Sequence, residues 1–165
     1  MFNTVEAADL ETLLKEKFSD NIISVEKHYD VSVATIKLES IKEVIKFLFD
    51  SGFTFLTSCN GMHFPEAMEK FGMVYHLHDL PKNLRLRIKT FTNEDPPTFP
   101  TLTDVYPSAN WMEREAYDFF GFKFTGHPNL KRILNVDDMV GWPLRKEYPL
   151  EDQARFDKDD KMFGR

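Results

Sequence analysis

The strongest secondary-structure signal in the chain comes from residues 73–89, which read MVYHLHDLPKNLRLRIK. In the first half, the apolar Met73, Tyr75 and Leu77 alternate with polar residues that include His76 and His78. In the second half, the apolar Leu84, Leu86 and Ile88 alternate with the basic Arg85, Arg87 and Lys89. The residues Pro81-Lys82-Asn83 separate the two halves. Because successive side chains of a β-strand point to opposite faces, each run gathers its apolar residues on one face. The stretch therefore predicts two strands joined by a turn, each with an apolar and a polar face.

Upstream of this stretch, the sequence predicts both helices and strands. Residues 40–51 place Ile41, Val44, Ile45 and Leu48 at helical spacing, and Gly52 follows where a helix C-cap belongs. The other expected elements are a helix over residues 5–18, strands over 22–29 and 31–38, and a strand over 53–59 with Phe53, Phe55 and Thr57 on one face.

Downstream, regular structure becomes sparse. Residues 94–100 contain three prolines and predict an extended connector that is neither helix nor strand interior. A helix is expected over residues 111–120, with Asn110 as its N-cap, Glu113 completing a capping box, and Gly121 ending it. Beyond Gly126 the chain is rich in proline, glycine and charge without sustained periodicity.

The order of elements predicts an α+β fold. We expect a mostly antiparallel or mixed sheet with helices on one face, followed by an extended C-terminal segment. The chain divides into a core domain over residues 1–95, a helix with an extended docking segment over 96–150, and a charged tail over 151–165, expected to be extended or disordered. Since the C-terminal third lacks apolar periodicity, we expect it to need a partner in order to pack.

Composition restricts the class of protein. The chain has 165 residues, 42% hydrophobic and 29% charged, which is typical of one globular domain and excludes wholesale disorder. Its 16 phenylalanines indicate a dense core or an apolar docking surface. The net charge of −6 disfavours binding to nucleic acid or to an anionic membrane surface.

Cysteine usage and hydropathy narrow the class further. Cys59 is the only cysteine, so the chain forms no internal disulfide and cannot supply four thiolates to an iron–sulfur cluster. The first 18 residues carry Glu6, Asp9 and Glu11 and do not resemble a signal peptide. Apolar runs are only a few residues long, so any association with a membrane is expected to pass through a partner.

Two kinds of site compete with simpler explanations. Cys59, His63, His76 and His78 are candidate zinc ligands, but two histidines on a polar strand face are more often solvated or in contact with a partner. Cys59 is also a candidate nucleophile, yet no local pattern supplies its base, and a structural cysteine in an irregular loop before the turn-forming Asn60-Gly61 pair is favoured.

Nucleotide and RNA sites are likewise disfavoured. With seven glycines and no glycine-rich loop, the chain offers no phosphate cradle. The basic strand of Arg85, Arg87 and Lys89 with nearby Phe91 imitates an RNA-binding sheet face, but it lacks the expected motif. A solvated face, or one covered by a protein partner, is the preferred interpretation.

The expected helix over residues 111–120 carries a cluster of charge. Glu113, Glu115 and Asp118 surround Arg114, and paired carboxylates can perform acid–base chemistry. The simpler interpretation is a charged helix face with an Arg114–Asp118 pair one turn apart. Aromatic residues flank these charges, so we expect the helix to bury one side in its own domain and to present charge to a second surface.

This helix also belongs to a longer pattern that resembles a known family. The matching blocks are YPSANW over 106–111, EREAYDFF over 113–120, His127, KRIL over 131–134, and GWPLRKEYP over 141–149. Their order and spacing resemble those of the C subunit of bacterial NADH:quinone oxidoreductase, respiratory complex I. An ordered match from Tyr106 to Pro149 is far more specific than a single short motif.

The resemblance implies a non-catalytic α+β subunit of the peripheral arm of a respiratory-chain translocase, with no active site, cofactor or metal on this chain. FMN, iron–sulfur clusters and quinone would be held by the rest of the complex. It implies partners beside the chain, namely the large quinone-site subunit and the neighbouring iron–sulfur subunits, and a peripheral position on the cytoplasmic side of the inner membrane. The alternative is the equivalent subunit of a related membrane-bound hydrogenase or of a ferredoxin- or coenzyme-linked complex.

The same resemblance marks the residues expected to shape or contact the docking surface. They are Glu113, Arg114, Glu115, Asp118, His127, Lys131, Arg145 and Tyr148. Arg114 is expected to pair within its helix or to reach the extended segment, whereas Arg145 is expected to pair with the partner.

Overall fold

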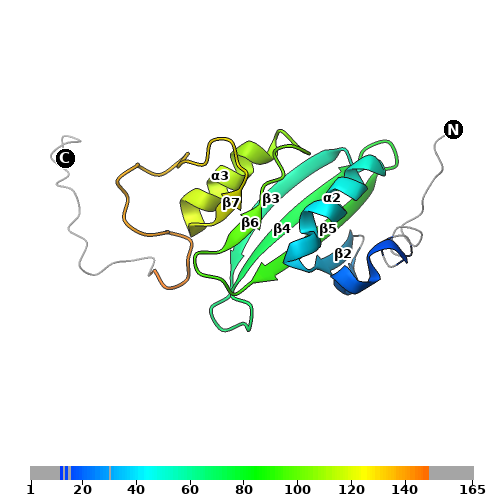
Figure 1. Ribbon diagram of the computed structural model, residues 1–165, viewed down its shortest axis with the longest axis horizontal. Helices are drawn as coiled ribbons and strands as arrows, with labels where there is room; N and C mark the ends of the chain where they lie inside the picture. The colour runs from blue at the N-terminus through cyan, green and yellow to red at the C-terminus, as the bar shows by residue number, and fades with distance from the viewer. Residues whose placement is uncertain (1–11, 13, 15, 30, 149–165) are drawn as a thin grey trace.

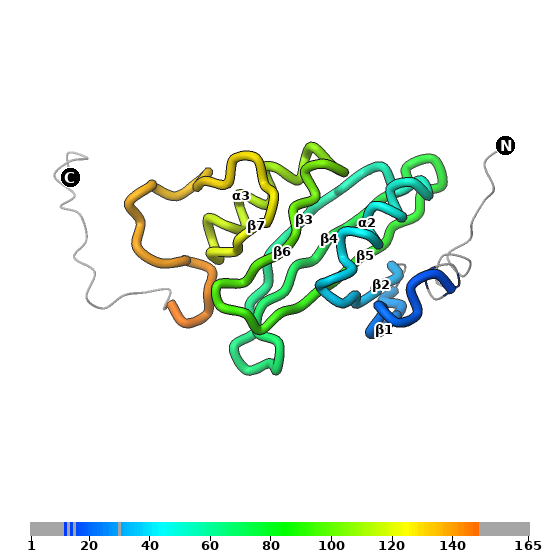
Figure 2. The backbone as a smooth tube through the Cα atoms, in the orientation of Figure 1, coloured from blue at the N-terminus to red at the C-terminus, as the bar shows by residue number. Residues whose placement is uncertain are grey.

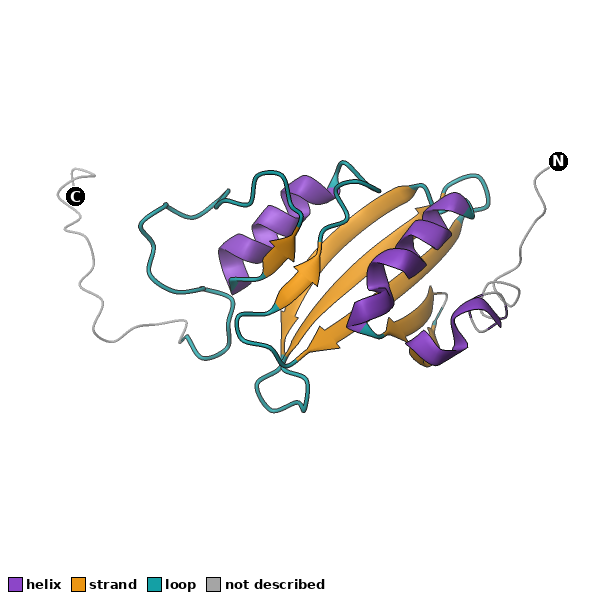
Figure 3. Ribbon diagram, in the orientation of Figure 1, coloured by secondary structure: helices purple, strands orange, loops and turns teal. Residues whose placement is uncertain are grey.

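The computed structural model describes residues 12, 14, 16–29 and 31–148. Its central feature is a five-stranded sheet in the order β1-β2-β5-β4-β3 (Figures 1 and 3). The elements are η1 (Ser19–Asn21), β1 (Ile22–His28), β2 (Val31–Ile36), η2 (Leu38–Ser40), α2 (Ile41–Asp50), β3 (Phe55–His63), β4 (Phe71–Asp79), β5 (Leu84–Thr92), β6 (Thr98–Pro100), α3 (Ala109–Phe120) and β7 (Lys123–Thr125).

The sheet is mixed, and the expected α+β class is confirmed. Neighbouring strands are antiparallel except for β2 and β5, which run parallel in the centre. A second, two-stranded parallel sheet joins β6 to β7. The parallel pair arises because α2 and the β3–β4 hairpin lie between β2 and β5 in the sequence.

The helices pack on one face of the main sheet, as Figure 1 shows for α2. The buried residues Ile41, Val44, Ile45 and Leu48 form the apolar stripe predicted for α2. Ala109 and Ala116 of α3 belong to the same hydrophobic core. Burying one apolar stripe from each helix against a shared sheet face produces a continuous core.

The strand pattern predicted for residues 73–89 is confirmed. Met73, Tyr75 and Leu77 of β4 are buried on the helix-covered face, while His76 and His78 are only half-buried on the other. Asn83 adopts a left-handed conformation with φ of 52° in the intervening turn. Asparagine tolerates this region better than most residues, which suits it to the turn.

The prediction for β3 was wrong in its length and its facing residues. The strand begins at Phe55 and continues through Asn60 and Gly61 to His63, where an irregular loop was expected. Phe55 and Thr57 are exposed, whereas Cys59 is buried, because an irregularity in the pairing with β4 shifts the register between Leu56 and Ser58. Such a shift changes which side chains reach the core.

Gly61 explains why a turn-forming pair lies inside a strand. A Cβ atom at this position would come within 2.8 Å of the ring of Phe120, at the end of α3. The glycine therefore allows α3 to approach β3 closely, and it makes no turn.

The expected extended connector is also partly wrong, since it contains β6. Phe99 of β6 packs with Phe122 and Phe124 near β7, and all three are buried. Residues from both sides of Asp95 thus join one hydrophobic core, including Leu102 and Ala109. The C-terminal third therefore contributes to packing within the chain; the division into core, docking segment and tail stays a prediction.

Both ends of the chain extend beyond the described residues. In the helix expected over 5–18, the described residues 12, 14 and 16–18 are helical, and Leu14 and Phe18 are buried. The tail over 151–165 lies outside the described residues. Among the described helices, none has the length and apolar character needed to cross a membrane.

Candidate functional site

The candidate site combines α3 with the irregular chain that follows β7. Of the expected docking region over 96–150, only the described part that follows β7, residues 126–148, is called the docking segment from here on. Figure 2 shows it as a wide loop at the end of the molecule opposite β1 and β2. Its path is determined by side chains from α3, which hold its backbone in the absence of regular secondary structure.

Asp118 is the principal anchor of this segment. Its Oδ2 atom accepts hydrogen bonds from the backbone N–H groups of Ile133, Leu134 and Asn135 at 3.0, 2.8 and 2.9 Å. The side chain has no exposed surface, and burial alone would raise its pKa. The backbone donors and the Arg132 guanidinium outweigh burial and hold the pKa of Asp118 well below its usual range, so the carboxylate stays ionised.

Arg132 completes the other side of the Asp118 carboxylate. Its Nη1 donates to Asp118 Oδ1 at 2.8 Å, and its Nη2 donates to the carbonyls of Met139 and Gly141 at 2.8 and 3.3 Å. The guanidinium carbon also lies 4.8 Å from the centroid of the Trp142 ring. One planar cation therefore ties α3 to two further points of the docking segment.

Arg114 performs a similar role on the preceding turn of α3. Its Nε and Nη2 donate to the carbonyls of Lys131 and Arg132 at 3.1 and 2.9 Å, and its guanidinium lies over the Trp111 ring at 5.2 Å. The expected pairing of Arg114 with Asp118 is wrong, because Asp118 is engaged with Arg132. The alternative expectation, that Arg114 reaches the extended segment, is confirmed.

Glu113 anchors α3 to the chain that precedes it. Its carboxylate accepts a 2.6 Å hydrogen bond from the Thr101 hydroxyl and a 2.7 Å bond from the Leu102 N–H. Burial raises the pKa of Glu113 to about 7, against the opposing effect of these two donors. The predicted capping box is wrong: α3 begins at Ala109, and Glu113 does not cap it.

His127 lies beside the same carboxylate. Its Nε2 is 3.2 Å from the Asn110 carbonyl oxygen and 3.9 Å from Glu113, and its Nδ1 accepts a bond from the Asn129 N–H. Since Nδ1 accepts this bond, Nε2 is the ring nitrogen that donates to the Asn110 carbonyl. This bond attaches the start of the docking segment to α3.

Arg145 and His63 hold the far end of the docking segment. Arg145 Nε donates to the Phe120 carbonyl at 2.6 Å, and its Nη1 lies 3.3 Å from Asp95 and 3.5 Å from Glu147. The His63 Nδ1 accepts the N–H of Lys146 at 3.0 Å. Arg145 was expected to pair with a partner, but its buried guanidinium is engaged within its own chain.

Aromatic rings close the same end of the segment. The Trp142 ring covers Gly121, where a Cβ atom would come within 2.5 Å of it, and packs edge-on against Tyr117 at 5.5 Å. The Tyr148 ring lies over Gly141, where a Cβ atom would be 2.8 Å away. Both glycines have positive φ angles, 74° and 90°, so side chains there would be strained as well as crowded.

While its backbone is held, the docking segment exposes large apolar side chains. Val140 is 95% exposed, and Leu134 and Val136 are each 67% exposed. Leu144, Tyr148 and the α3 residue Trp111 are also exposed. A group of exposed apolar side chains on an ordered backbone is typical of a surface that binds another protein.

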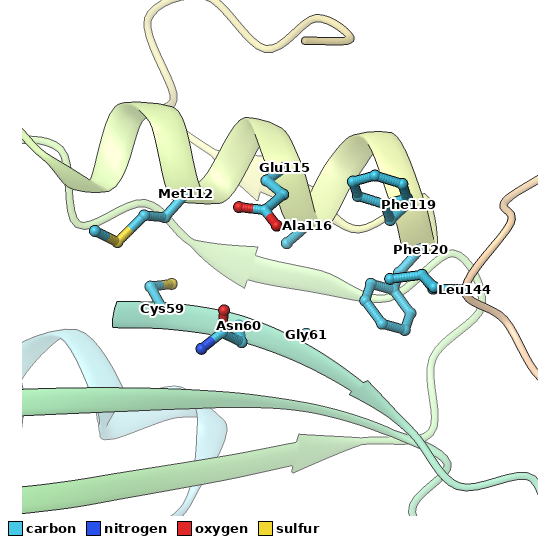
Figure 4. Close-up of a pocket in the computed structure, with 9 residues that line it drawn as sticks. All are labelled: Cys59, Asn60, Gly61, Met112, Glu115, Ala116, Phe119, Phe120 and Leu144. Atoms are coloured by element: carbon cyan, nitrogen blue, oxygen red, sulfur yellow. The ribbon is translucent and has the colours of Figure 1, made fainter. Parts of the chain in front are cut away.

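A small pocket lies between α3 and β3, next to this surface. It encloses about 120 Å³ and is lined by Cys59, Asn60, Gly61, Met112, Glu115, Ala116, Phe119, Phe120 and Leu144 (Figure 4). Figure 4 shows the Glu115 carboxylate directed between the helix and the strand. Burial raises the pKa of the Cys59 thiol well above its usual value, and no described histidine bonds to it, so the pocket offers no activated nucleophile.

The sequence-predicted residues therefore separate into a buried and an exposed group, with His127 half-buried between them. Glu113, Arg114, Asp118 and Arg145 are buried within the chain, so the expectation that the first three present charge to a second surface is wrong. Glu115, Lys131 and Tyr148 are exposed and remain available for contact with a partner. Whether any of these residues contributes to docking stays a prediction.

Sequence reasoning missed three residues that organise the site. Arg132 and Trp142 lie within the family blocks, but no local pattern gives them a role, and His63 stands out in the sequence only as a metal ligand. Their roles depend on long-range contacts, which the local periodicity of apolar residues does not predict. Within the described part of the chain, no group of three or more His, Cys, Asp or Glu residues is arranged to hold a metal ion.

Comparison with known proteins gives the relatives of this chain. The family model described as the respiratory-chain NADH dehydrogenase 30 Kd subunit matches residues 34–154. The C subunit of NADH-quinone oxidoreductase from Sinorhizobium medicae is 38% identical over 158 residues, covering 93% of this chain and 78% of that protein. Its counterpart from Citrifermentans bemidjiense is 41% identical over 143 residues, covering 86% of this chain and 89% of that protein.

Solved structures share the fold. The trypsin-resistant fragment (1-134) of Nqo5 superposes with a TM-score of 0.66 at 32% identity, covering 73% of this chain and 98% of the fragment. A chain of an archaeal membrane-bound sulfane sulfur reductase, a respiratory membrane complex, superposes with a TM-score of 0.75 at 21% identity. This second likeness covers 91% of this chain and 94% of the other, and it concerns the fold alone.

Proposed function

The chain belongs to the family of the 30 Kd subunit of respiratory-chain NADH dehydrogenase, and from this premise we propose that it is a structural, non-catalytic subunit of a proton-translocating NADH:quinone oxidoreductase. In this proposal it lies in the peripheral arm, on the cytoplasmic side of the inner membrane, and stabilises the quinone-reducing module. It binds the large quinone-site subunit and the adjacent iron–sulfur subunits, and these and other subunits carry the FMN, clusters and quinone.

The observation that carries the proposal is the order of the docking segment. Buried Asp118 and Arg114, together with the largely buried Arg132, fix its backbone within the free chain, while Leu134 and Val140 are exposed. Binding is stronger when the interface is ordered beforehand, because less conformational entropy is lost on association. The arrangement is suited to a permanent contact between subunits.

The charged groups of α3 also support a role in structure. Each buried carboxylate of α3 accepts hydrogen bonds from two or more donors of its own chain, so these donors occupy its oxygen atoms. A general acid or base needs access to the group whose proton it transfers. We therefore propose that Glu113 and Asp118 position the docking segment and perform no proton transfer in the complex.

The proposal is tested by changing the exposed apolar residues in the assembled enzyme. We expect the double variant Leu134→Asp, Val140→Asp to lower the amount of assembled complex by about tenfold or more, since a charge buried at an interface without a partner is costly. Both side chains are largely exposed in the free chain, so its own stability should change little. Native gels and quinone reductase activity are measured on the same membranes.

A matched control is Tyr29→Asp at the opposite end of the molecule. Tyr29 is 98% exposed and has a φ of 55°, a conformation that aspartate tolerates. We expect this variant to assemble normally. Activity per assembled complex should stay near normal in both variants; normal assembly of the double variant, with activity abolished, contradicts the structural role.

The alternative, an equivalent subunit of a related hydrogenase-type or ferredoxin-linked complex, keeps the same docking chemistry. Its support is the shared fold with the archaeal complex at 21% identity, whereas the relatives from NADH-quinone oxidoreductases reach 38% and 41%. Proteins that co-purify with the chain from detergent-solubilised membranes separate the two: NADH-oxidising subunits support the first proposal, and hydrogenase-type subunits support the second.

A further inference from the structure

A second surface lies on the face of the sheet opposite α2 and α3. We call it the basic face, formed by Arg85, Arg87 and Lys89 of β5 with His76 and His78 of β4. The register places Arg87 beside His76 and Arg85 beside His78. Arg85, Arg87 and Lys89 are cations that gather on one face of a chain whose net charge is −6. The docking segment lies in another part of the molecule, so it does not explain why the basic residues gather there.

The cations of the basic face have no acidic partners within the described part of the chain. No described carboxylate forms an ion pair with Arg85, Arg87 or Lys89. Glu26, on β1 of the same sheet, is instead paired with His28 at 3.0 Å. Three adjacent cations repel one another, and an acidic ligand would remove that repulsion.

Hydrogen bonds hold Arg87 in a fixed position. Its Nε donates to His76 Nε2 at 2.8 Å, so this ring nitrogen is an acceptor. The His76 proton therefore lies on Nδ1, which donates to the Ser58 hydroxyl oxygen at 2.8 Å. This chain of bonds leaves the two terminal nitrogens of Arg87 and the hydroxyl proton of Ser58 without acceptors among the described residues.

The same bonds exclude a catalytic use of Ser58. A base that activates serine must accept the hydroxyl proton, whereas His76 donates to Ser58 and has its other nitrogen occupied by Arg87. The group is better suited to binding: Arg87 presents a planar fork, and a carboxylate accepts such a fork through two parallel bonds.

A groove beside Arg87 gives a ligand access to these donors. It has a volume of about 470 Å³ and is lined by Val31, Phe55, Thr57, Ser58, His76, Leu77, His78, Arg85, Leu86 and Arg87. Phe55 is 47% exposed and supplies an apolar wall. The mixture of apolar wall and oriented donors fits a side chain with its neighbouring peptide better than a small free ion.

We propose that the basic face is a second docking site, which binds an acidic segment of another subunit with an Asp or Glu carboxylate on Arg87. Arg85 and Lys89 pair with further acidic residues of that segment. The proposal rests on the proposed function, since it assumes that the chain works inside a larger complex. It adds a second contact, on the opposite face of the sheet, with a partner of defined charge.

The occupant is identified by photo-crosslinking in the assembled complex. A benzoylphenylalanine at position 85, where the native arginine is exposed and has no partner in the described chain, should form an adduct with a segment rich in Asp or Glu from another subunit. Mass spectrometry then locates the attached residue. An adduct with lipid, nucleic acid or residues 151–165 of this chain overturns the proposal, and so does the absence of any adduct.

The energetic contribution is tested by neutralising the cations. We expect Arg85→Gln with Arg87→Gln to lower the assembled complex by about tenfold, and to reduce its tolerance of high salt. Arg85→Gln alone should give a smaller effect in the same direction. Arg85 forms no side-chain bond to a residue that the structure describes, so misfolding is not the expected cause. Lys46→Gln removes the same charge from α2 on the other side of the sheet and should assemble normally.

The outcomes separate this proposal from the proposed function. If Leu134→Asp, Val140→Asp loses assembly while the position-85 crosslinker gives no adduct, the structural role stands and the basic face is solvated. If the crosslinker attaches to an acidic segment of a neighbouring subunit but the apolar double variant assembles normally, the proposal that the docking segment binds a partner is wrong. The proposal for the basic face then stands. Normal assembly of Arg85→Gln with Arg87→Gln contradicts the basic face directly.

Discussion

The β4–β5 region and the docking segment hold their shape by different means. In β4 and β5, Tyr75, Leu77 and Ile88 are buried among many apolar neighbours, and each side chain contributes a share of the packing. In the docking segment, one ion pair, the buried Asp118 with the largely buried Arg132, fixes much of the backbone. Apolar packing is therefore distributed, whereas the order of the docking segment depends on a few bonds.

This difference has consequences for folding and for function. A sheet core loses stability in proportion to the apolar area removed, because its contacts are non-directional. A buried ion that loses its partner leaves the other charge desolvated and unpaired, which costs more than the bond itself contributed. Single changes should therefore release the docking segment while the sheet remains folded, and three predictions examine this.

The largest effect is expected for Asp118→Ala. It removes the acceptor for three backbone N–H groups and leaves Arg132 without its carboxylate, at a cost of about 3–5 kcal/mol. In a Trp111→Phe background, fluorescence reports Trp142 alone. We expect the fluorescence of Trp142 to change at a lower urea concentration than the circular dichroism signal of the sheet. This order of the two transitions would show that the docking segment is released before the sheet unfolds.

The matched comparison for Asp118→Ala is Leu48→Ala, in the apolar core under α2. A core cavity of this kind costs about 2–5 kcal/mol and should shift both signals together. If Asp118→Ala also moves the two signals together, the docking segment and the sheet form one cooperative unit, and the contrast between them is wrong.

A smaller effect is expected for Arg114→Ala, which removes two charged hydrogen bonds to the carbonyls of Lys131 and Arg132. We expect a loss of about 2 kcal/mol and less assembled complex, with near-normal activity per assembled complex. Arg114→Lys should recover only part, because one ammonium does not reproduce the planar fork. Quinone reductase activity that disappears at full assembly would instead indicate proton or quinone chemistry at Arg114.

The smallest effect is expected at His63, whose ring accepts the Lys146 N–H. Burial lowers the pKa of His63, and the nearby Arg145 acts in the same direction against Glu147. The folded chain therefore prefers neutral His63. Its stabilising contribution is fully present above the unfolded pKa of about 6.5 and is lost as the pH falls below it.

The measurement is the free energy of unfolding of the native chain and of His63→Gln between pH 7.5 and about 5. Glutamine retains an acceptor but does not titrate, so the difference between the two profiles isolates His63. The subtraction is needed because Glu113, with its pKa raised to about 7, also titrates in this range. Its contribution to the free energy of unfolding falls as the pH rises, which is opposite to the contribution of His63. Parallel profiles would show that His63 does not hold the segment.

The two regions also differ in what the sequence predicts. The alternation of Met73, Tyr75 and Leu77 with histidines predicts β4, because the period of a strand is local and survives in the sequence. The stripe from Ile41 to Leu48 predicts α2 for the same reason. In both β4 and α2, the side chains that the local pattern marks as apolar are the ones that are buried, so the local sequence is sufficient to predict these elements.

The docking segment could not be predicted in this way. Asp118 looks like one member of a helical charge pair, yet its partners lie 14–17 residues away. Strands β6 and β7 have three residues each, too few for a period, and β6 contains Pro100. From the sequence alone, Gly61 looks like part of an Asn-Gly turn. Its structural role is to leave room for the Phe120 ring, and this contact between distant parts of the chain is not visible in the sequence. Family resemblance located the segment but not its bonds.

The bonds to Asp118 imply that the docking segment is ordered by its own chain before any partner binds. Amide hydrogen exchange of Ile133, Leu134 and Asn135 in the free, full-length chain tests it most directly, since all three N–H groups donate to Asp118. We predict protection of roughly a hundredfold or more, lost in Asp118→Ala while β4 and β5 stay protected. Exchange of these three amides at the rate of an unstructured chain, with protection appearing only in the assembled complex, would contradict the account.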